Sequence, residues 1–143
     1  MRAGLVRSEA MSPQAVARLM AVGRVAIGGV LMAAPQITKP FWVRNRDYNG
    51  GVALFGRMVG ARDLGIGAGL LAALGSGAPT GGWLAVGMLA DAADIAAAAI
   101  ERDRLPPTAL PIFIAVAGSG VLMGAYALAA GEDSAAGGAP APA

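Results

Sequence analysis

Residues 110–130 read LPIFIAVAGSGVLMGAYALAA and include no charged side chain. A helix needs about 20 consecutive apolar residues to cross the hydrocarbon core of a bilayer, so this stretch is long enough to span a membrane. Three stretches of similar composition precede it, separated by short segments rich in glycine, proline or charged residues. The sequence therefore predicts four transmembrane helices, at residues 13–34, 51–74, 83–100 and 107–130.

The composition of the whole chain supports the same fold class. Of the 143 residues, 56% are hydrophobic and 14% are charged, and the mean hydropathy is +0.60. Soluble domains carry about 25% charged residues, and a soluble bundle would need a charged outer face that most of these helices lack. We therefore predict an all-α protein in which residues 13–130 form a four-helix transmembrane bundle.

Missing and rare residue types exclude several functions. Cysteine and histidine are both absent, which excludes disulfides, thiolate chemistry, haem held by either residue and the usual zinc sites. The net charge of +2 is too small to indicate nucleic-acid binding. Every basic residue except Lys39 is an arginine. This bias is typical of GC-rich bacterial genomes, so we expect a multi-pass protein of a bacterial plasma membrane.

Capping residues and prolines mark the ends of the first helix. Ser12 is a favourable N-cap, Pro13 suits the first helical position and Pro35 ends the helix. The polar residues 1–12 precede it as an N-terminal tail. At the other end of the chain, residues 131–143 are rich in Ala, Gly and Pro, and we expect them to form a disordered C-terminal tail.

The connections between the predicted helices suggest an orientation. Four spans place the loops at residues 35–50 and 101–106 on one side of the membrane and both termini on the other. These loops hold five basic residues: Lys39, Arg44, Arg46, Arg102 and Arg104. The positive-inside rule therefore favours cytoplasmic loops and external termini. The first loop also has the aromatic and basic mixture of a membrane-surface anchor, with Phe41, Trp42 and Tyr48.

Six ionisable residues lie inside stretches that otherwise have the composition of membrane-spanning helices: Arg24, Arg57, Arg62, Asp63, Asp91 and Asp94. A charge inside the bilayer is unfavourable, so such residues usually face protein or a wet cavity and often mark a functional site. Asp91 and Asp94 are three residues apart and share one face of the third helix. Each opposes insertion by about 2.5–3.5 kcal/mol near the bilayer centre, so this helix should depend on partners.

The depth of each charge predicts its partner. With a rise of about 1.5 Å per residue, Asp94 lies at the depth of Arg57, measured from the loop side. Asp91 matches Arg24 and also Arg62. Three helices thus place opposite charges at matching depths, and the six charges sum to zero. We therefore expect a neutral network of ion pairs in the centre of the bundle.

Glycine pairs indicate close packing between helices. Gly56-x-x-x-Gly60 in the second predicted helix and Gly120-x-x-x-Gly124 in the fourth are small-residue motifs that let helix backbones approach. Asp63 shares the face of the first pair, so we expect it to lie against a neighbouring backbone. Packing within one chain is the simpler interpretation of both motifs, and dimerisation is the alternative.

The charged residues allow several functions. A neutral network could serve only to hold the helices in register, or it could form a proton or ion path. It could also line a pocket, where Asp91 and Asp94 could hold a divalent cation beside a phosphate headgroup. This pattern of two carboxylates is too weak to predict a metal site. One carboxylate of Asp63, Asp91 and Asp94 could instead act as a general acid or base, and these three are the catalytic candidates.

Several motifs resemble those of small four-span bacterial membrane proteins, the DoxX-like group and related uncharacterised families. They are Gly23-Arg24-x-x-x-Gly28, the helix end at Pro35, and Gly60-Ala-Arg62-Asp63-Leu-Gly65. The spacing of four short spans extends the resemblance over about residues 13–130. The resemblance implies an uncharacterised membrane protein, and for some relatives an accessory role in quinone-linked oxidation. Because this chain has no redox-active residues, that role would require a partner or a bound quinone.

We expect the polar core to open toward the loop side and to bind a small amphipathic or anionic lipid-like molecule. The arginines Arg24, Arg57 and Arg62 would contact its anionic part. Asp91 and Asp94 would orient these arginines or bind a cation. Whether the protein is an enzyme acting on that molecule, and with which cofactor, is left open.

The alternative is a non-catalytic subunit of a larger membrane complex, or a homo-oligomer, surrounded by membrane lipids. This alternative predicts tight internal pairing of the charges. It also predicts an exposed glycine face, at Gly120 and Gly124.

Overall fold

The computed structural model describes residues 11–39 and 49–136. This part of the chain contains four long helices and one short 3-10 helix, and no strand. The elements are α1 (Pro13–Ala33), η1 (Pro35–Thr38), α3 (Gly50–Ser76), α4 (Gly81–Ile100) and α5 (Ala109–Ala136). The prediction of an all-α four-helix bundle is confirmed. Each long helix contains a segment long and apolar enough to cross a membrane, which indicates a multi-pass membrane protein.

The helix boundaries follow local capping chemistry. The Ser12 hydroxyl accepts a hydrogen bond from the Ala15 amide, as expected of an N-cap. Asn49 caps α3 in the same way, which the sequence analysis did not predict. The α3 helix ends at Ser76 and is capped by Gly77, whose φ of 69° lies in the left-handed region that glycine adopts without strain.

The last helix differs from the prediction at both ends. It begins at Ala109 rather than at residue 107 and continues to Ala136 rather than ending at residue 130. A glycine such as Gly131 weakens a helix by only about 1 kcal/mol, and no proline follows until Pro140. The predicted surface anchor at Phe41, Trp42 and Tyr48, residues 1–10 of the N-terminal tail and residues 137–143 of the C-terminal tail lie outside the described residues.

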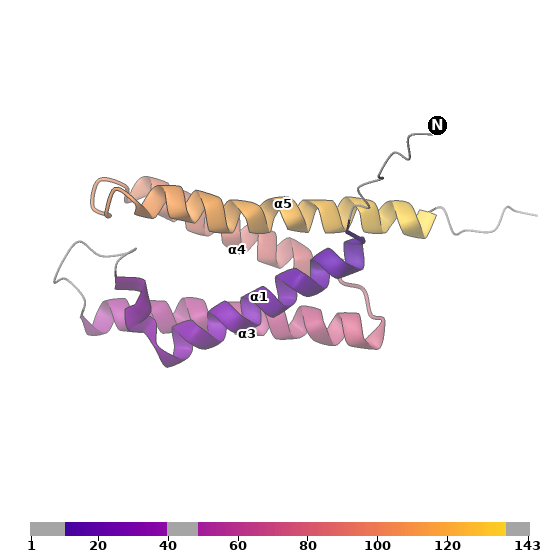
Figure 1. The fold of residues 1–143 in the computed structure, drawn as a ribbon, viewed down its shortest axis with the longest axis horizontal. Helices are drawn as coiled ribbons and strands as arrows, with labels where there is room; N and C mark the ends of the chain where they lie inside the picture. Colours follow the sequence, from indigo (N-terminus) through magenta and orange to yellow (C-terminus); the bar gives the residue numbers. More distant parts are fainter. Residues whose placement is uncertain (1–10, 40–48, 137–143) are drawn as a thin grey trace, which may run out of the picture.

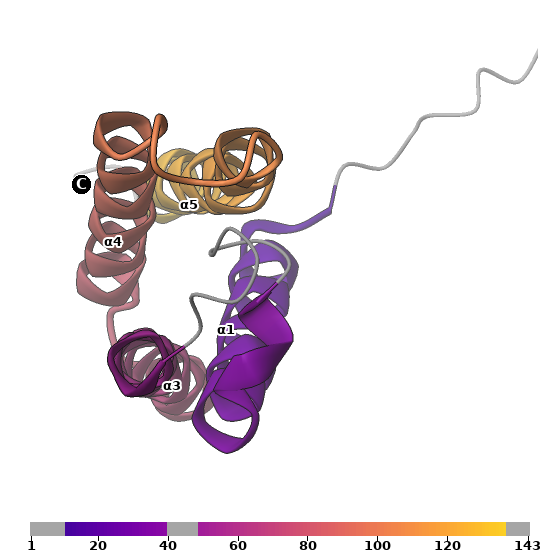
Figure 2. The same ribbon diagram turned by 90° about the vertical axis from the view of Figure 1, so that its left-hand side faces the viewer.

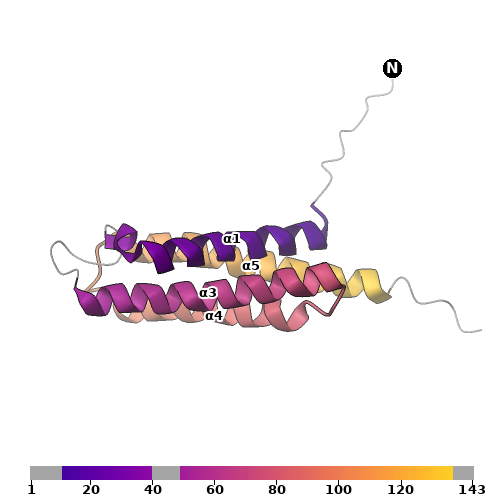
Figure 3. The same cartoon turned by 90° about the horizontal axis from the view of Figure 1, so that it is seen from below.

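The four long helices run along a common axis (Figures 1 and 3). Viewed end-on, they form a ring in the order α1, α3, α4 and α5 (Figure 2). The start of α1, the turn at residues 77–80 and the end of α5 lie together, and we call this the terminal end (Figure 1). We call the opposite end, with η1, the start of α3 and residues 101–108, the loop end. The helices form two closely packed pairs, α1 with α3 and α4 with α5. The two pairs approach each other at the terminal end, and α1 diverges from α5 toward the loop end (Figure 1).

Glycines bring the backbones of α1 and α3 into contact. A methyl group on Gly28 would lie 2.6 Å from the carbonyl oxygen of Gly60, and one on Gly60 would lie 2.8 Å from the carbonyl oxygen of Gly28. Gly67 approaches the carbonyl oxygen of Ala21 in the same way, at 2.8 Å. The glycine face of α3 therefore serves packing within the chain, as the simpler interpretation predicted.

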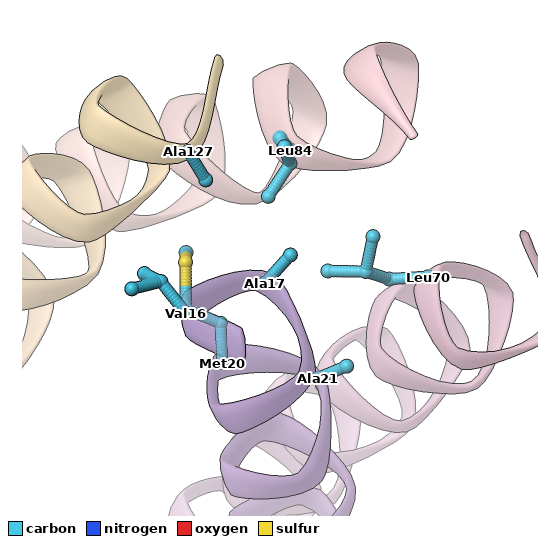
Figure 4. Close-up of a cluster of buried hydrophobic side chains, with 7 residues drawn as sticks. All are labelled: Val16, Ala17, Met20, Ala21, Leu70, Leu84 and Ala127. Atoms are coloured by element: carbon cyan, nitrogen blue, oxygen red, sulfur yellow. The ribbon is translucent and has the colours of Figure 1, made fainter. Parts of the chain in front are cut away.

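The apolar core lies at the terminal end, where all four long helices contribute small or branched side chains. Figure 4 shows this cluster, which consists of Val16, Ala17, Met20, Ala21, Leu70, Leu84 and Ala127. The outer surface is also apolar. Leu19, Leu54, Leu89 and Leu122, one from each long helix, are 53%, 60%, 70% and 73% exposed. An apolar exterior on every helix is the surface expected of a protein surrounded by lipid.

Candidate functional site

Five of the six ionisable residues that the sequence singles out meet between α1, α3 and α4. We call them the charge cluster: Arg24, Arg62, Asp63, Asp91 and Asp94. They lie beyond the apolar core, toward the loop end. Among them, Arg24, Asp63 and Asp91 are buried. The expectation that intramembrane charges turn inward is confirmed for these residues.

Arg24 joins α1 to the adjacent helix α3 and, across the bundle, to α4. Its Nη1 donates to Asp63 Oδ1 at 3.2 Å, and its Nη2 donates to Asp91 Oδ2 at 2.5 Å. The same Nη2 donates to the backbone carbonyl of Gly87 at 2.9 Å. Gly87 also provides the space for this contact, because a methyl group there would lie 3.1 Å from Nη2. The predicted pairing of Arg24 with Asp91 is confirmed.

Arg62 joins α3 to α4 through a two-pronged ion pair. Its Nη1 and Nη2 donate to Asp94 Oδ1 and Oδ2, each at 2.8 Å, which is the bidentate geometry that a planar guanidinium favours. Its Nε and Nη2 also donate to Asp63 Oδ1, at 3.2 Å and 3.1 Å. Asp63 therefore accepts hydrogen bonds from both arginines and connects the two halves of the charge cluster.

The predicted pairing of Asp94 with Arg57 is wrong. Arg57 is exposed and makes no ion pair with the described residues. The Cα–Cβ bonds of a helix tilt toward its N-terminus, and α3 begins at the loop end. The long side chain of Arg62 therefore reaches back toward the loop end, to the depth of Asp94. Depths measured along the backbone misplace a guanidinium by most of the length of its side chain.

This change of partner alters the charge of the site. The prediction of a neutral network included Arg57, which lies on the outer face of α3. The charge cluster contains two guanidinium groups and three carboxyl groups, so its formal charge is one negative unit when all five are ionised. The facing helix α5 brings no compensating charge, since residues 109–130 contain none.

A cavity of about 380 Å³ lies beside the charge cluster, between α1 and α5. We call it the cluster cavity. Its walls are mostly apolar, with Leu19 and Ile27 from α1 and Ile112, Val116 and Met123 from α5 among them. Its polar lining residues are Arg24, Asp63, Asp91, Asp94 and Ser119. The site is therefore an apolar space with a charged inner wall.

A second cavity of about 470 Å³ lies toward the loop end, and we call it the loop-end cavity. Its lining includes Asn49, the N-cap of α3, Phe55 from α3 itself and Glu101 at the end of α4. The two cavities share three lining residues, Val59, Asp94 and Phe113. Asp94 thus borders both spaces, which matches the prediction of a polar core on the loop side.

Two carboxylate oxygens of the charge cluster have no hydrogen-bond donor within the described residues. They are Oδ1 of Asp91 and Oδ2 of Asp63, since each arginine contact goes to the other oxygen. No fully buried side-chain oxygen or nitrogen in the described part of the chain lacks a partner. These two oxygens are therefore accessible, and both residues line the cluster cavity.

The predicted site residues thus divide into three groups. Asp63, Asp91, Asp94 and Arg24 line the cluster cavity. Arg62 supports them through ion pairs and is not among the lining residues of either cavity. Arg57 belongs to neither the charge cluster nor the lining.

Two glycines of α5, which the sequence indicates only as a helix-packing motif, also border the site. A methyl group on Gly120 would overlap the carboxylate of Asp91. Gly124 is buried, and a methyl group there would lie 2.5 Å from Cγ of Met88. Both glycines therefore face α4 of the same chain. The matching depths of Gly120 and Asp91 on neighbouring helices were the signal that could have revealed this contact.

The described residues include no group of three or more carboxylate, histidine or cysteine side chains placed to hold a metal ion. Asp91 and Asp94 instead form ion pairs with Arg24 and Arg62, respectively. Comparisons with known proteins found no matching family model, no similar curated protein and no similar solved structure. The resemblance to the DoxX-like group stays a hypothesis.

Proposed function

We propose that this protein, in a bacterial plasma membrane, binds a small amphipathic molecule in the cluster cavity. The polar end of the molecule contacts the charge cluster, and its apolar part lies along α1 and α5. The observation that carries this proposal is an apolar cavity with buried carboxylates on its inner wall, two of whose oxygens accept no hydrogen bond from the described part of the chain. Small-molecule sites usually combine apolar walls with a few well-placed polar groups.

The size of the cluster cavity supports a small ligand. Its volume of about 380 Å³ lies within the range of roughly 300–1,000 Å³ that is typical of ligand pockets. The loop-end cavity adjoins it at Asp94 and offers a second apolar space. A molecule with a short or branched apolar part fits the first cavity alone, and a longer chain extends into the second.

The polar contacts favour an amphipathic ligand over an anionic one. Arg24 and Arg62 already donate to the three carboxylates of the charge cluster, and Arg57 borders neither cavity. An anionic head group would have to displace a carboxylate from its arginine and leave that carboxylate buried without a partner. The unoccupied groups are acceptors, so a hydrogen-bond donor on the ligand is the better complement. An oxidised quinone, whose carbonyl oxygens are acceptors, complements this wall less well.

A pair of glycine variants on α1 tests the proposal. Gly23 lines the cluster cavity, and open space surrounds the position that a side chain would occupy there. Gly23→Leu should therefore fill the cavity without disturbing the helices. Gly29→Leu is the matched control, because Gly29 also faces open space but lines neither cavity.

The measurement is native mass spectrometry of the detergent-purified proteins, with identification of the small molecules they release. We expect the wild type and Gly29→Leu to retain the same small molecule and Gly23→Leu to lose it at least tenfold. Circular dichroism establishes that all three proteins are equally helical. Equal retention by Gly23→Leu and the wild type would place the ligand elsewhere and refute the proposal.

The accessory-subunit alternative loses one of its supports. It predicts tight internal pairing of the charges, and Arg24 and Arg62 do pair with the three carboxylates of the charge cluster. It also predicts an exposed glycine face on the last helix, whereas Gly120 and Gly124 pack against α4. The same purification keeps this alternative testable. A defined second protein that remains bound to an otherwise empty wild-type protein would favour it.

A further inference from the structure

The charge cluster has one carboxyl group more than it has guanidinium groups. Arg24 and Arg62 face Asp63, Asp91 and Asp94, and α5 contributes no charge to this wall. Arg18 and Arg57 are the other basic residues of α1 and α3, and both are exposed. An uncompensated charge in a buried, water-poor site is strongly unfavourable, so such a site attracts a counter-charge.

The unoccupied acceptors lie where a counter-charge from the cavity could reach them. Asp63 and Asp91 are only 7% and 8% exposed, yet both line the cluster cavity. Arg24 takes one oxygen of each carboxylate, at 3.2 Å and 2.5 Å. The second oxygen of each accepts no hydrogen bond from the described residues. Because both residues line the cluster cavity, a positively charged group in that cavity would lie beside these two carboxylates.

We infer that the polar end of the ligand carries one positive charge and pairs with Asp91 and Asp63, which completes the charge cluster. This inference rests on the proposed function and names the class of ligand: a monocation with an apolar body, such as a primary alkylammonium. An ammonium group is compact and presents three donors and no acceptor, which complements a wall of carboxylate acceptors. The apolar walls between α1 and α5 accommodate the alkyl part.

Three probes with the same tail separate the charge of the head group from the apolar contribution. They are decylamine, decanol and sodium decanoate, titrated into the full-length protein in maltoside micelles at pH 7.5, with empty micelles as the blank. Isothermal titration calorimetry gives each Kd. We expect decylamine to bind at least tenfold more tightly than decanol, and decanoate to bind more weakly than decanol. This comparison uses the wild type and does not depend on the folding of a variant.

Variants then assign the selectivity to the charge cluster. Asp91→Asn removes the excess negative charge and should bring the affinities for decylamine and decanol within threefold of each other. Asp103→Asn is the control, because Asp103 is an exposed carboxylate in the α4–α5 connection, and it should leave the tenfold preference unchanged. Gly23→Leu should weaken all three probes together, since it blocks the cavity and leaves the charges intact.

The results test separately whether the cluster cavity binds an amphiphile and whether that amphiphile is cationic. Should none of the three probes bind the wild type, the proposed amphiphile site fails. Should decanol or decanoate bind as tightly as decylamine, the site stands but its ligand is not cationic. In that second case the missing positive charge is a proton on one of the carboxyl groups or an ion from solution.

Discussion

The two ends of this bundle are built in different ways. At the terminal end, small and branched apolar side chains from all four helices pack into a core, with Leu70 and Leu84 almost fully buried. Toward the loop end, the helices border two cavities, and ion pairs of the charge cluster join α4 to the adjacent α3 and, across the bundle, to α1. Packing holds the helices together at the terminal end, which leaves room for the two cavities toward the loop end.

The largest loss of stability should come from replacing Arg24, which connects the α1–α3 pair to α4. Arg24→Gln leaves Asp63 and Asp91 without their guanidinium partner, and breaking a buried ion pair destabilises a protein by about 3–5 kcal/mol. We expect a loss of this size in the free energy of unfolding, measured by titrating the protein from mild detergent into SDS. Arg57→Gln, a matched change on the outer face of α3, should cause no measurable loss. Equal stability of the two variants would show that the charge cluster does not connect the helices.

A loss of stability of intermediate size should distinguish the terminal end from the loop end. Leu84→Ala truncates a side chain that is 2% exposed, in the apolar core. Truncations of this kind cost about 2–5 kcal/mol in soluble cores, and we expect the lower limit here because lipid surrounds the alternative state. Val116→Ala, in the wall of the cluster cavity and 57% exposed, should cost less than about 1 kcal/mol. The same SDS titration measures both. A larger loss at Val116 would mean that the loop end is the more tightly packed half.

The smallest effect concerns the contact that keeps α1 beside α3 along its length. Gly28→Ala introduces a methyl group 2.6 Å from the Gly60 carbonyl oxygen, and overpacking of this kind costs about 1–3 kcal/mol. Gly29→Ala is the matched control, because open space surrounds its neighbouring position and alanine favours helix. We expect Gly28→Ala to unfold at lower SDS and Gly29→Ala to match or exceed the wild type. If both unfold together, the backbone contact between the helices is not limiting.

Much of the fold could be predicted from local sequence properties. The four helices follow from four apolar stretches, because lipid excludes charge. The cap at Ser12 and the glycine face that includes Gly60 follow from residue types and their spacing along the chain. The pairing of Arg24 with Asp91 was also predictable, because both side chains point away from the loop end and their relative depth is preserved.

The remaining features depend on how the helices are rotated and packed. The partner of Asp94 could not be predicted from backbone depth alone. The side chain of Arg62 extends back along α3 to reach Asp94, whereas Arg57 is exposed on the outer face of the helix. The cluster cavity also has no sequence signature, since it arises where α1 diverges from α5 (Figure 1).

The sequence by itself determined that four helices span the membrane and that their charges must turn inward, because lipid solvates neither charges nor unpaired backbone. Only the tertiary structure decided which charges meet. Side-chain direction and helix rotation placed Arg57 outside the charge cluster and left three carboxyl groups facing two arginines. That imbalance, beside an apolar cavity, is the physical basis of the proposed site.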